Sequence, residues 1–549
     1  MKMDEETKEL SWRHYVNIRQ LRVEPFVLLY MIGYSLSAMA VSQLVQDKLC
    51  RVDYDQSSIF CISINSADFD HGGETIKSDI IKDATYITLY RTLLSTLPCI
   101  IWALFLGPWS DNYVNGRKYI MIVGAIAAAL ESVILIINAS LFDLSGYYVL
   151  LSFIPSALTG GIVATLMAIY AYCSATSDKY TRSTRFAIVE ICFWIAQPIG
   201  SFIGGQILGD GDQNTKYQLY NYIPVFVVSL CAHIAAIIWA ILVIDEQQSL
   251  LDSAQPIDIR PSNPLPLDID HSDLNIEPGV PVNGVCINSD REEMLSPNES
   301  INESYMLNSS IISLNGISQR SRQLWNEFLN IFHLEHVHKL WCSFIRRRSY
   351  WGREQIWILF LSTAFLLLVY LNTTFILWSY VEKLYSWPPK FYSNITSITA
   401  IGTLILMGLV LPIFVHILQF GDLRLALLGV LSLMSQCILR GSWQHEIGLY
   451  LSFIAGTLAP LSVIGIRSRL SKIIDNDERG KLFALLAIVE AVTPGIASLF
   501  YSIIFTSTID VYPGLVFQLA AFILLIPLLA IIFIDTYCIH DYDEQPLNR

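Results

Sequence analysis

Blocks of apolar residues, each about 20 long, limit the fold of this chain more than any other feature. A helix of that length crosses the roughly 30 Å hydrocarbon core of a bilayer. Hydrophobic residues make up 53% of the 549, and the mean hydropathy of +0.47 excludes an ordinary water-soluble domain. We therefore predict an all-α membrane protein with twelve spans, near 25–46, 86–106, 118–138, 147–173, 184–208, 221–244, 355–380, 393–417, 424–440, 447–470, 481–505 and 512–536.

The polar segments between the blocks differ in their basic residues, and this difference predicts the orientation of the chain. Arg and Lys gather in one set of segments, at 1–24, 107–118, 174–185, 245–354 and 467–481. Basic residues near membrane spans are retained on the cytosolic side. We therefore predict that these segments and the tail 537–549 are cytosolic. The first 24 residues are polar and charged, so a cleavable signal peptide is not expected.

The long segment 245–354 separates the spans into a half at 25–244 and a half at 355–536. Two six-helix halves around a linker are typical of transporters whose halves are related by an axis along the membrane normal. Residues 248–320 are rich in Ser, Asn, Pro and Asp without a helical period, which predicts disorder. Aromatic residues at helical spacing in 323–346 predict an amphipathic helix on the membrane surface.

Three carboxylates interrupt the apolar blocks: Glu131, Glu190 and Glu490. The tetrapeptide Ala-Ile-Val-Glu ends at Glu190 in the fifth block and at Glu490 in the eleventh, which are equivalent positions in the two halves. A charge at mid-bilayer costs on the order of 3 kcal/mol, so such a residue faces a watery cavity, pairs with a cation or holds a proton. We predict that Glu190 and Glu490 take part in proton coupling. A structural hydrogen bond is the alternative, and we favour it for Glu131.

The sequence Gly-Pro-Trp-Ser-Asp-Asn-Tyr-Val-Asn-Gly-Arg-Lys lies between the second and third blocks. Gly116 allows a tight turn, and Asp111 can pair with Arg117 or Lys118. This segment, which begins at Gly107, resembles the loop signature of the major facilitator superfamily, Gly-x-x-x-Asp-x-x-Gly-Arg-Lys/Arg, with two additional residues between the acid and the second glycine. The resemblance implies the twelve-helix major facilitator fold, with Asp111 and Arg117 closing the cytosolic side in one state.

Three further stretches resemble the proton-coupled folate and heme carriers of solute carrier family 46. They are LRVEPFVLLYMIGYSLSAMAVSQLVQDKLC at 21–50, RSTRFAIVE at 182–190 and IGIRSRLSKIIDNDERGKLFALLA at 464–487. The resemblance implies that Glu190 couples protons and that Arg467 binds a proton or the substrate. A basic residue at a helix end remains the alternative for Arg467. The folate carrier has a functional histidine in its seventh helix, whereas this chain has Asn372 nearby and no histidine there, so a substrate other than folate is expected.

Together these features predict a secondary transporter, not an enzyme. We expect symport of protons with a bulky organic anion, which is folate-like, heme-like, a conjugated steroid, a muropeptide or a lysosomal catabolite. Arg467, Asn372 and Gln197 are the predicted substrate ligands, protons are the coupling ion, and no cofactor or metal is expected. An uncoupled uniporter and a sensor or scaffold whose linker recruits partners are the alternatives. The sequence has no nucleotide-binding P-loop and no basic patch for nucleic acid.

Cys50 and Cys61 share the first loop on the non-cytosolic side, where an oxidising space would let them form a disulfide. The folate carrier links this loop to the one after its seventh helix, but 383–392 has no cysteine here, so the resemblance favours a local bridge. A sorting signal of the acidic dileucine type, read by adaptors, is predicted at Glu246, Leu250 and Leu251. We therefore expect a lysosomal or endosomal membrane, with the plasma membrane as the alternative.

Overall fold

The computed structural model describes eight stretches of the chain: 21–66, 73–112, 115–177, 182–211, 218–245, 351–418, 420–473 and 479–538. These stretches are helical, contain no strand, and belong to one compact unit. The predicted disorder at 248–320, the amphipathic helix at 323–346 and the sorting signal at Glu246, Leu250 and Leu251 lie outside the described residues. These three remain predictions from the sequence.

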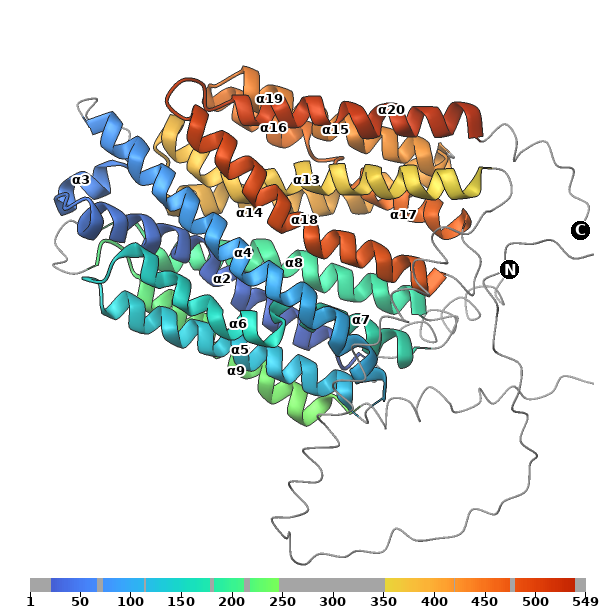
Figure 1. Cartoon of the computed structure of the whole chain (residues 1–549), viewed down its shortest axis with the longest axis horizontal. Helices are drawn as coiled ribbons and strands as arrows, with labels where there is room; N and C mark the ends of the chain where they lie inside the picture. Colours follow the sequence, from blue (N-terminus) through green and yellow to red (C-terminus); the bar gives the residue numbers. More distant parts are fainter. Residues whose placement is uncertain are drawn as a thin grey trace, which may run out of the picture. The chain divides into compact units, whose positions relative to one another are not determined.

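The first half of the bundle contains long antiparallel helices joined by short turns (Figure 1). A short connection makes consecutive helices antiparallel neighbours. The described elements are α2 (Glu24–Lys48), the π-helical turn η2 (Leu49–Asp53), α3 (Ser58–Ser63), α4 (Glu74–Asn112), α5 (Gly116–Ser140), the 3₁₀ helix η4 (Gly146–Phe153), α6 (Ile154–Thr159), α7 (Gly161–Ala175), α8 (Arg182–Leu208) and α9 (Tyr222–Val243).

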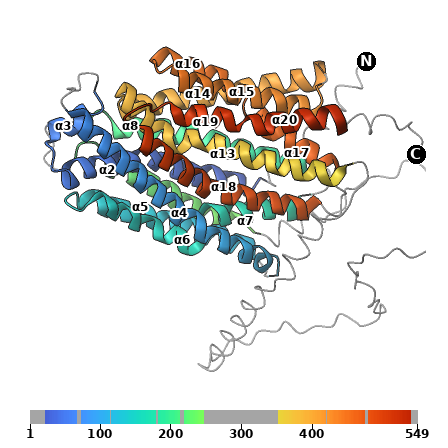
Figure 2. The same cartoon turned by 45° about the horizontal axis from the view of Figure 1, so that its top comes forward.

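The second half lies beside the first and repeats its up-and-down pattern (Figure 2). Its described elements are α13 (Gly352–Tyr385), α14 (Pro389–Pro412), η5 (Ile413–Ile417), α15 (Asp422–Ser442), α16 (Glu446–Ala455), α17 (Leu461–Ile473), α18 (Arg479–Thr508), α19 (Leu515–Ile523), α20 (Leu525–Phe533) and η6 (Ile534–Cys538). By length and composition, ten of the described helical segments can cross a membrane. The remaining two predicted spans correspond to α4 and to the pair α16 and α17.

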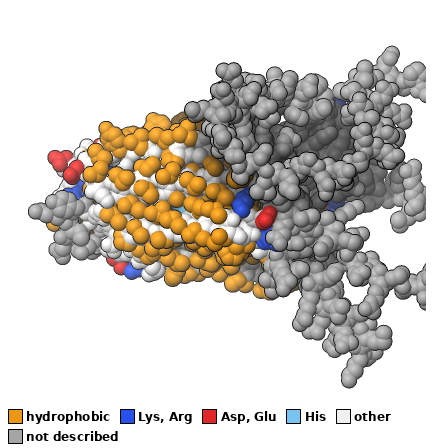
Figure 3. All heavy atoms as spheres, turned by 90° about the horizontal axis from the view of Figure 1, so that it is seen from below, with side chains coloured by type: hydrophobic (Ala, Val, Ile, Leu, Met, Phe, Trp, Pro, Cys, Tyr) orange, Lys and Arg blue, Asp and Glu red, His pale blue; other side chains and the backbone are white. Residues whose placement is uncertain are grey.

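The lipid-facing surface is apolar between two charged ends. Figure 3 shows a band of hydrophobic side chains over α5 and α9, with charged side chains at its margins. Exposed residues of this band include Val123, Ile126, Leu130, Ile234 and Ile238. Large exposed aliphatic side chains over a whole face suit a hydrocarbon environment and not water. The chain is therefore a multi-pass membrane protein.

Three spans that we predicted as single helices are interrupted, and the twelfth is divided at Leu524 into α19 and α20. The fourth changes direction at Gly160 and Gly161, whose φ angles of 84° and 49° lie in the left-handed region that glycine tolerates best. The tenth consists of α16 and α17, joined through Pro460. By contrast, α8 continues through Pro198 and α18 continues through Pro494. Hydropathy alone cannot distinguish a broken span from a continuous one, because both have the same composition.

The helix α4 is longer than the second predicted span, because it begins at Glu74 and not near residue 86. Its additional turns lie outside the apolar block and carry Lys77, Ser78 and Lys82, which contact the second half. Lys77 Nζ donates a hydrogen bond to Ser386 Oγ at 2.7 Å, and Lys383 Nζ donates one to Ser78 Oγ. Farther along, α18 packs across the middle of α4, where Leu93 and Thr96 lie beside Gly495.

The contacts of Lys77 and Ser78 with the second half lie at the end of the bundle that contains α3, which we call the outer end. The opposite end, which we call the basic end, carries Arg117, Lys118, Arg185 and Lys472. At the outer end α8 packs against α14, and Lys390 Nζ forms an ion pair with Asp210 at 2.7 Å. The two halves are thus tied together at the outer end by several polar contacts.

A close approach between the halves gives the first prediction. A Cβ atom on Gly205 of α8 would lie 2.6 Å from Ser393 Cβ of α14. Gly205→Val should force these helices apart. Overpacking of this kind costs roughly 1–3 kcal/mol, which lowers the ratio of molecules with these helices in contact to molecules with them apart about fivefold or more. Pulsed EPR distances between spin labels at Leu141 of the first half and Val511 of the second, which are exposed near the outer end, would measure this opening.

Gly402→Val is the matched control, because a Cβ there has no neighbouring atom within 4 Å. The distance distribution should be unchanged in Gly402→Val. An unchanged distribution in Gly205→Val as well would contradict the proposed close packing.

The ion pair between Lys82 and Asp510 gives the second prediction, on pH. Its Nζ–Oδ2 distance is 2.6 Å, and both groups lie outside the predicted spans with side chains 25% and 51% exposed. The hydrogen bond from Lys82 lowers the pKa of Asp510 from 3.8, and the same bond raises the pKa of Lys82 from 10.5. The carboxylate therefore stabilises the closed outer end above pH 3.8, and this contribution is lost as the pH falls through its lowered pKa. The contribution of Lys82 is present below pH 10.5 and is lost as the pH rises through its raised pKa.

We therefore expect this pair to remain intact at about pH 5, the acidity of endosomal compartments. EPR distances between labels on α4 and α18 should be constant between about pH 7 and pH 5. Asp510→Asn should show a small change at every pH, because exposed pairs contribute little. A transition of the wild-type distance near pH 5 that Asp510→Asn lacks would show that the pair is a pH-sensitive contact.

Candidate functional site

Glu190 lies on α8, and each of its carboxylate oxygens accepts a hydrogen bond. The hydroxyl of Tyr170 on α7 donates to Oε1 at 2.8 Å. The indole Nε1 of Trp194 donates to Oε2 at 3.1 Å. Trp194 follows Glu190 by four residues, so the helical period places both on one face of α8. Two donors of the first half therefore hold this carboxylate.

Arg467 and Glu490 form an ion pair within the second half. Arg467 lies on α17 and Glu490 on α18, and Nη2 donates to Oε1 at 2.5 Å. The side chains are 42% and 29% exposed, so water or a solute can reach the pair. A charge-assisted bond of this length is strong, and the arginine keeps further N–H groups for another acceptor.

The two arrangements face each other across the boundary between the halves. Arg467 interacts electrostatically with Glu190 as well as with Glu490, and Tyr170 interacts with both members of the pair. We call Tyr170, Glu190, Arg467 and Glu490 the charge cluster. Its charged groups give a formal charge of −1, from one cation and two carboxylates. The two glutamates of the repeated tetrapeptide thus approach the same arginine.

The structure gives less information on the other two predicted substrate ligands, Gln197 and Asn372. Gln197 lies seven residues after Glu190, on the same face of α8 and farther toward the outer end. Its main-chain carbonyl accepts a hydrogen bond from Ser35 Oγ of α2 at 2.5 Å. Asn372 lies in α13, but its side chain is outside the described part of the structure. A role in substrate binding stays a prediction for both residues.

The motif of the basic end spans the turn from α4 to α5. Gly107 and Asp111 lie in the last turns of α4, and Gly116 begins α5. A Cβ on Gly116 would lie 2.7 Å from the Ser110 carbonyl oxygen, so the close approach of the two helices requires glycine. Lys118 Nζ donates to the Ile241 carbonyl at 3.0 Å, at the end of α9. The side chain of Asp111 is not described, so its pairing with Arg117 stays a prediction.

Glu131 has a different environment from the charge cluster, because its contacts stay within the first half. Ser156 Oγ of α6 donates to Glu131 Oε2 at 2.8 Å, and Arg91 of α4 interacts with the same carboxylate electrostatically. The Arg91 guanidinium also lies over the Phe153 ring at 4.6 Å. These contacts fit the structural alternative that we favoured for Glu131.

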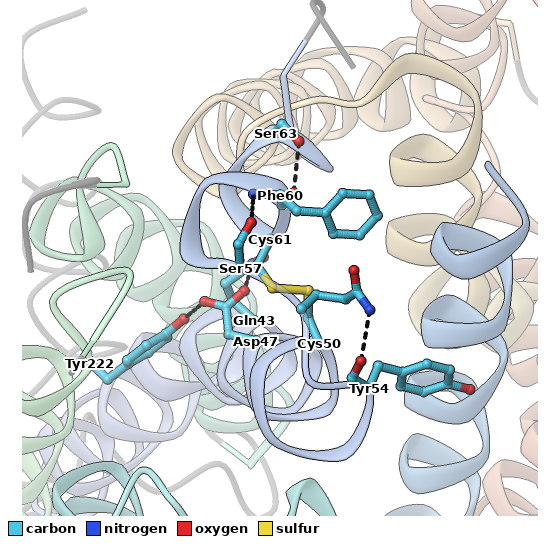
Figure 4. The surroundings of a disulfide bond; sticks show 10 residues. Gln43, Asp47, Cys50, Tyr54, Ser57, Phe60, Cys61, Ser63 and Tyr222 are labelled. Atoms are coloured by element: carbon cyan, nitrogen blue, oxygen red, sulfur yellow. Dashed lines mark hydrogen bonds between the residues drawn. A yellow bond between two sulfur atoms is a disulfide. The ribbon is translucent and has the colours of Figure 1, made fainter. Parts of the chain in front are cut away.

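Cys50 and Cys61 form a disulfide in the first loop at the outer end (Figure 4). Beside it, Asp47 accepts hydrogen bonds from Tyr222 and from Gln43 (Figure 4). Three residues after Cys61, the Ile64 carbonyl accepts from Lys77 Nζ at 3.0 Å, and Lys77 also contacts the second half. The local bridge therefore supports a loop that takes part in the outer contacts.

Two members of the site could not be selected from the sequence. Trp194 had a signal, because it lies one turn from Glu190, but an aromatic residue in a membrane helix usually faces lipid or the protein core. Tyr170 lacked any signal, since it lies twenty residues before Glu190 on a helix interrupted at Gly160. The pairing of Arg467 with Glu490 depends on the relative rotation of α17 and α18, which the pattern of residues does not specify.

Comparison with known families decides the fold. The family model described as Major Facilitator Superfamily matches residues 27–498. The chain belongs to the major facilitator superfamily. This major facilitator protein is therefore a membrane transporter, and its halves correspond to the two six-helix halves of that fold.

Among curated proteins, this transporter is similar to members of solute carrier family 46. It is 21% identical over 520 residues to the probable peptidoglycan muropeptide transporter SLC46 of Drosophila melanogaster, covering 91% of this chain and 83% of that one. It is 30% identical over 138 residues to the proton-coupled folate transporter of Bos taurus, covering 25% and 29%. The lysosomal proton-coupled steroid conjugate and bile acid symporter SLC46A3 of Mus musculus is 30% identical over 135 residues, covering 24% and 29%.

Solved structures show the same fold. A D-xylose-proton symporter superposes with a TM-score of 0.59 at 13% identity, covering 95% of this chain and 98% of the other. The human organic anion transporter MFSD10 superposes with a TM-score of 0.55 at 12% identity, covering 93% and 99%. At these identities the likeness extends to the fold and not to the substrate.

Proposed function

We propose that this major facilitator transporter is a proton-coupled symporter of a bulky organic anion. Glu190 takes up and releases the proton, and Arg467 pairs with the anion. The observation that carries the proposal is the charge cluster, in which a carboxylate of one half faces an Arg–Glu pair of the other half. Alternating access moves the halves relative to each other, so the environment of the carboxylate changes in each cycle.

Charge balance explains why the two solutes would move together. The empty cluster has a formal charge of −1, and an organic anion alone would bring it to −2 in a region with a low dielectric constant. An added proton on Glu190 restores −1. Binding of the anion is therefore favoured when Glu190 is protonated, and Arg467 can then exchange part of its contact with Glu490 for the anionic group. The second carboxylate, Glu490, keeps Arg467 neutralised when the site is empty.

The curated relatives support this class of substrate. Their names include a proton-coupled folate transporter, a proton-coupled symporter of steroid conjugates and bile acids, and a probable muropeptide transporter. These solutes are bulky, and a carboxylate or sulfate group would suit the guanidinium of Arg467. We place the protein in a lysosomal or endosomal membrane, with the basic end in the cytosol. Movement would then run from the acidic lumen to the cytosol.

The experiment is uptake into proteoliposomes with an imposed pH step. The purified full chain would be tested with radiolabelled folate, a bile acid, a steroid conjugate and a muropeptide. Coupling of one proton to each solute across one pH unit sustains about tenfold accumulation, since one unit corresponds to about 1.36 kcal/mol. We expect at least one probe to accumulate in this way.

The two hydrogen bonds to Glu190 also fit the uncoupled alternative, in which this carboxylate is purely structural. Uptake that equilibrates without accumulation, whatever the pH step, would indicate a uniporter. If none of the probes moves and the linker binds a partner when a probe is added, the sensor hypothesis would replace transport.

A further inference from the structure

The two side chains that donate hydrogen bonds to Glu190 have no part in the proton-coupling proposal. Trp194 and Tyr170 both belong to the first half, as does Glu190. When the halves rock as rigid bodies, these hydrogen bonds move with the carboxylate and remain formed. Arg467 belongs to the second half, so its distance from Glu190 changes during the cycle. Glu190 therefore keeps its two hydrogen-bond donors throughout the cycle, whereas its distance from Arg467 varies.

We propose that Trp194, together with Tyr170, is a positioning residue that sets the pH at which Glu190 takes up its proton. This inference rests on the proposed function and extends it. An ionised carboxylate accepts hydrogen bonds, whereas a protonated one must give up an acceptor site. One O–H donor on one oxygen and one N–H donor on the other therefore favour the ionised form of the carboxylate.

The geometry supports a positioning role because Glu190 has a donor on each side. The indole N–H reaches Oε2 at 3.1 Å from the same helix, and the phenol reaches Oε1 at 2.8 Å from α7. The Phe193 ring contacts the indole edge-on with 5.4 Å between ring centroids, and the Phe186 ring stacks on Tyr170 at 5.9 Å. The neighbouring rings hold both donors in place.

Among the residues that the structure describes, two further charged groups face Glu190. Arg467 of α17 and Glu490 of α18 face it from the second half. Charged residues on other helices packed against α8 have partners elsewhere: Glu24 of α2 lies 3.6 Å from Arg185, and Lys390 of α14 pairs with Asp210. Trp194 and Tyr170 are thus the donors that can be changed without altering a charge.

The test is an infrared pH titration of the purified full chain in vesicles, which requires no substrate. A protonated carboxyl has a C=O stretching band, and the band that Glu190→Gln lacks belongs to Glu190. Trp194→Phe keeps an aromatic ring, although a smaller one, and removes the N–H donor. We expect the half-intensity of the band to move to higher pH by about one unit, because the ionised carboxylate loses a hydrogen bond that the protonated carboxyl needs less.

Tyr170→Phe should produce a shift in the same direction, which keeps the test valid if one variant folds poorly. Trp443→Phe is the matched control, because Trp443 is similarly exposed, at 47% against 43%, but lies at the end of α15. The pH dependence of probe uptake should shift in parallel with the band.

The outcomes separate the two proposals. If Trp194→Phe and Tyr170→Phe both titrate as the wild type does, or if Trp443→Phe shifts equally, the positioning role is refuted while proton coupling stands. If the wild type has no titrating band that Glu190→Gln lacks, Glu190 does not exchange a proton, and both proposals fail together.

Discussion

Glu190→Gln should leave a transporter that exchanges substrate but no longer accumulates it. Gln cannot bind a proton, yet it is similar in size and still accepts a hydrogen bond from Tyr170 Oη. The variant therefore resembles the permanently protonated state. Across a step of one pH unit we expect the accumulation ratio to fall from about tenfold to about one. Exchange of labelled for unlabelled probe, which needs no net proton movement, should stay within about threefold of the wild-type rate.

Glu131→Gln is the control for this result. Glu131 is the other carboxylate of the apolar blocks in the first half, and its contacts with Ser156 and Arg91 lie away from the charge cluster. We expect it to retain accumulation. If Glu190→Gln accumulates the probe with the wild-type pH dependence, Glu190 is a structural residue and the coupling group lies elsewhere.

Arg467→Gln should abolish transport, and the double variant Arg467→Gln/Glu490→Gln should not restore it. Each single change leaves one charge of the pair alone, whereas the double change removes both. Because the pair is partly exposed, the stability cost should be below the roughly 3–5 kcal/mol of a fully buried pair. We expect thermal midpoints a few degrees lower in each single variant and near the wild-type value in the double variant.

Transport would separate the two roles of Arg467. A residue that only stabilises the fold would regain function with its stability, whereas a residue that binds the substrate anion would not. We therefore expect uptake in the double variant to remain at least about tenfold below wild type, because a lost charged hydrogen bond to the substrate contributes 1.5 kcal/mol or more. Recovery of uptake in the double variant would show that Arg467 acts only through Glu490.

The pair Arg353 and Glu354 provides the matched control. Its distance is 2.7 Å and its side chains are 34% and 38% exposed, close to the values of the functional pair. It lies at the start of α13, at the basic end. Arg353→Gln should change neither uptake nor the thermal midpoint by a comparable amount.

The architecture could be predicted from the sequence because a bilayer imposes a fixed length on apolar helices. The long break at 245–354 and the segment from Gly107 to Lys118 then specified two halves and the superfamily. The same reasoning failed at helix ends. Hydropathy does not detect the first turns of α4, because they lie outside the apolar block and are held by polar contacts such as that of Lys77 with Ser386.

The site was predictable to the extent that a lone charge in an apolar block is costly. That argument selected Glu190 and Glu490 without knowledge of their neighbours. It could not select the partners, because Tyr170, Glu190 and Arg467 come from three helices whose rotations no periodicity specifies. The family resemblance implied that Arg467 binds a proton or the substrate, with a basic residue at a helix end as the alternative, and neither interpretation included the ion pair with Glu490.

The length of α4 has a mechanical consequence. Its 39 residues form one uninterrupted helix of roughly 58 Å, at 1.5 Å per residue. Lys82 lies near one tip, the Gly107–Asp111 motif lies near the other, and Gly495 of α18 touches the middle. Pro98 lies two residues after Thr96, and a proline inside a helix is a common site of bending, so the two arms of α4 can change their angle beside the contact with Gly495. We expect a substitution at one tip to change distances at the other tip only to the extent that α4 tilts as one body about this contact.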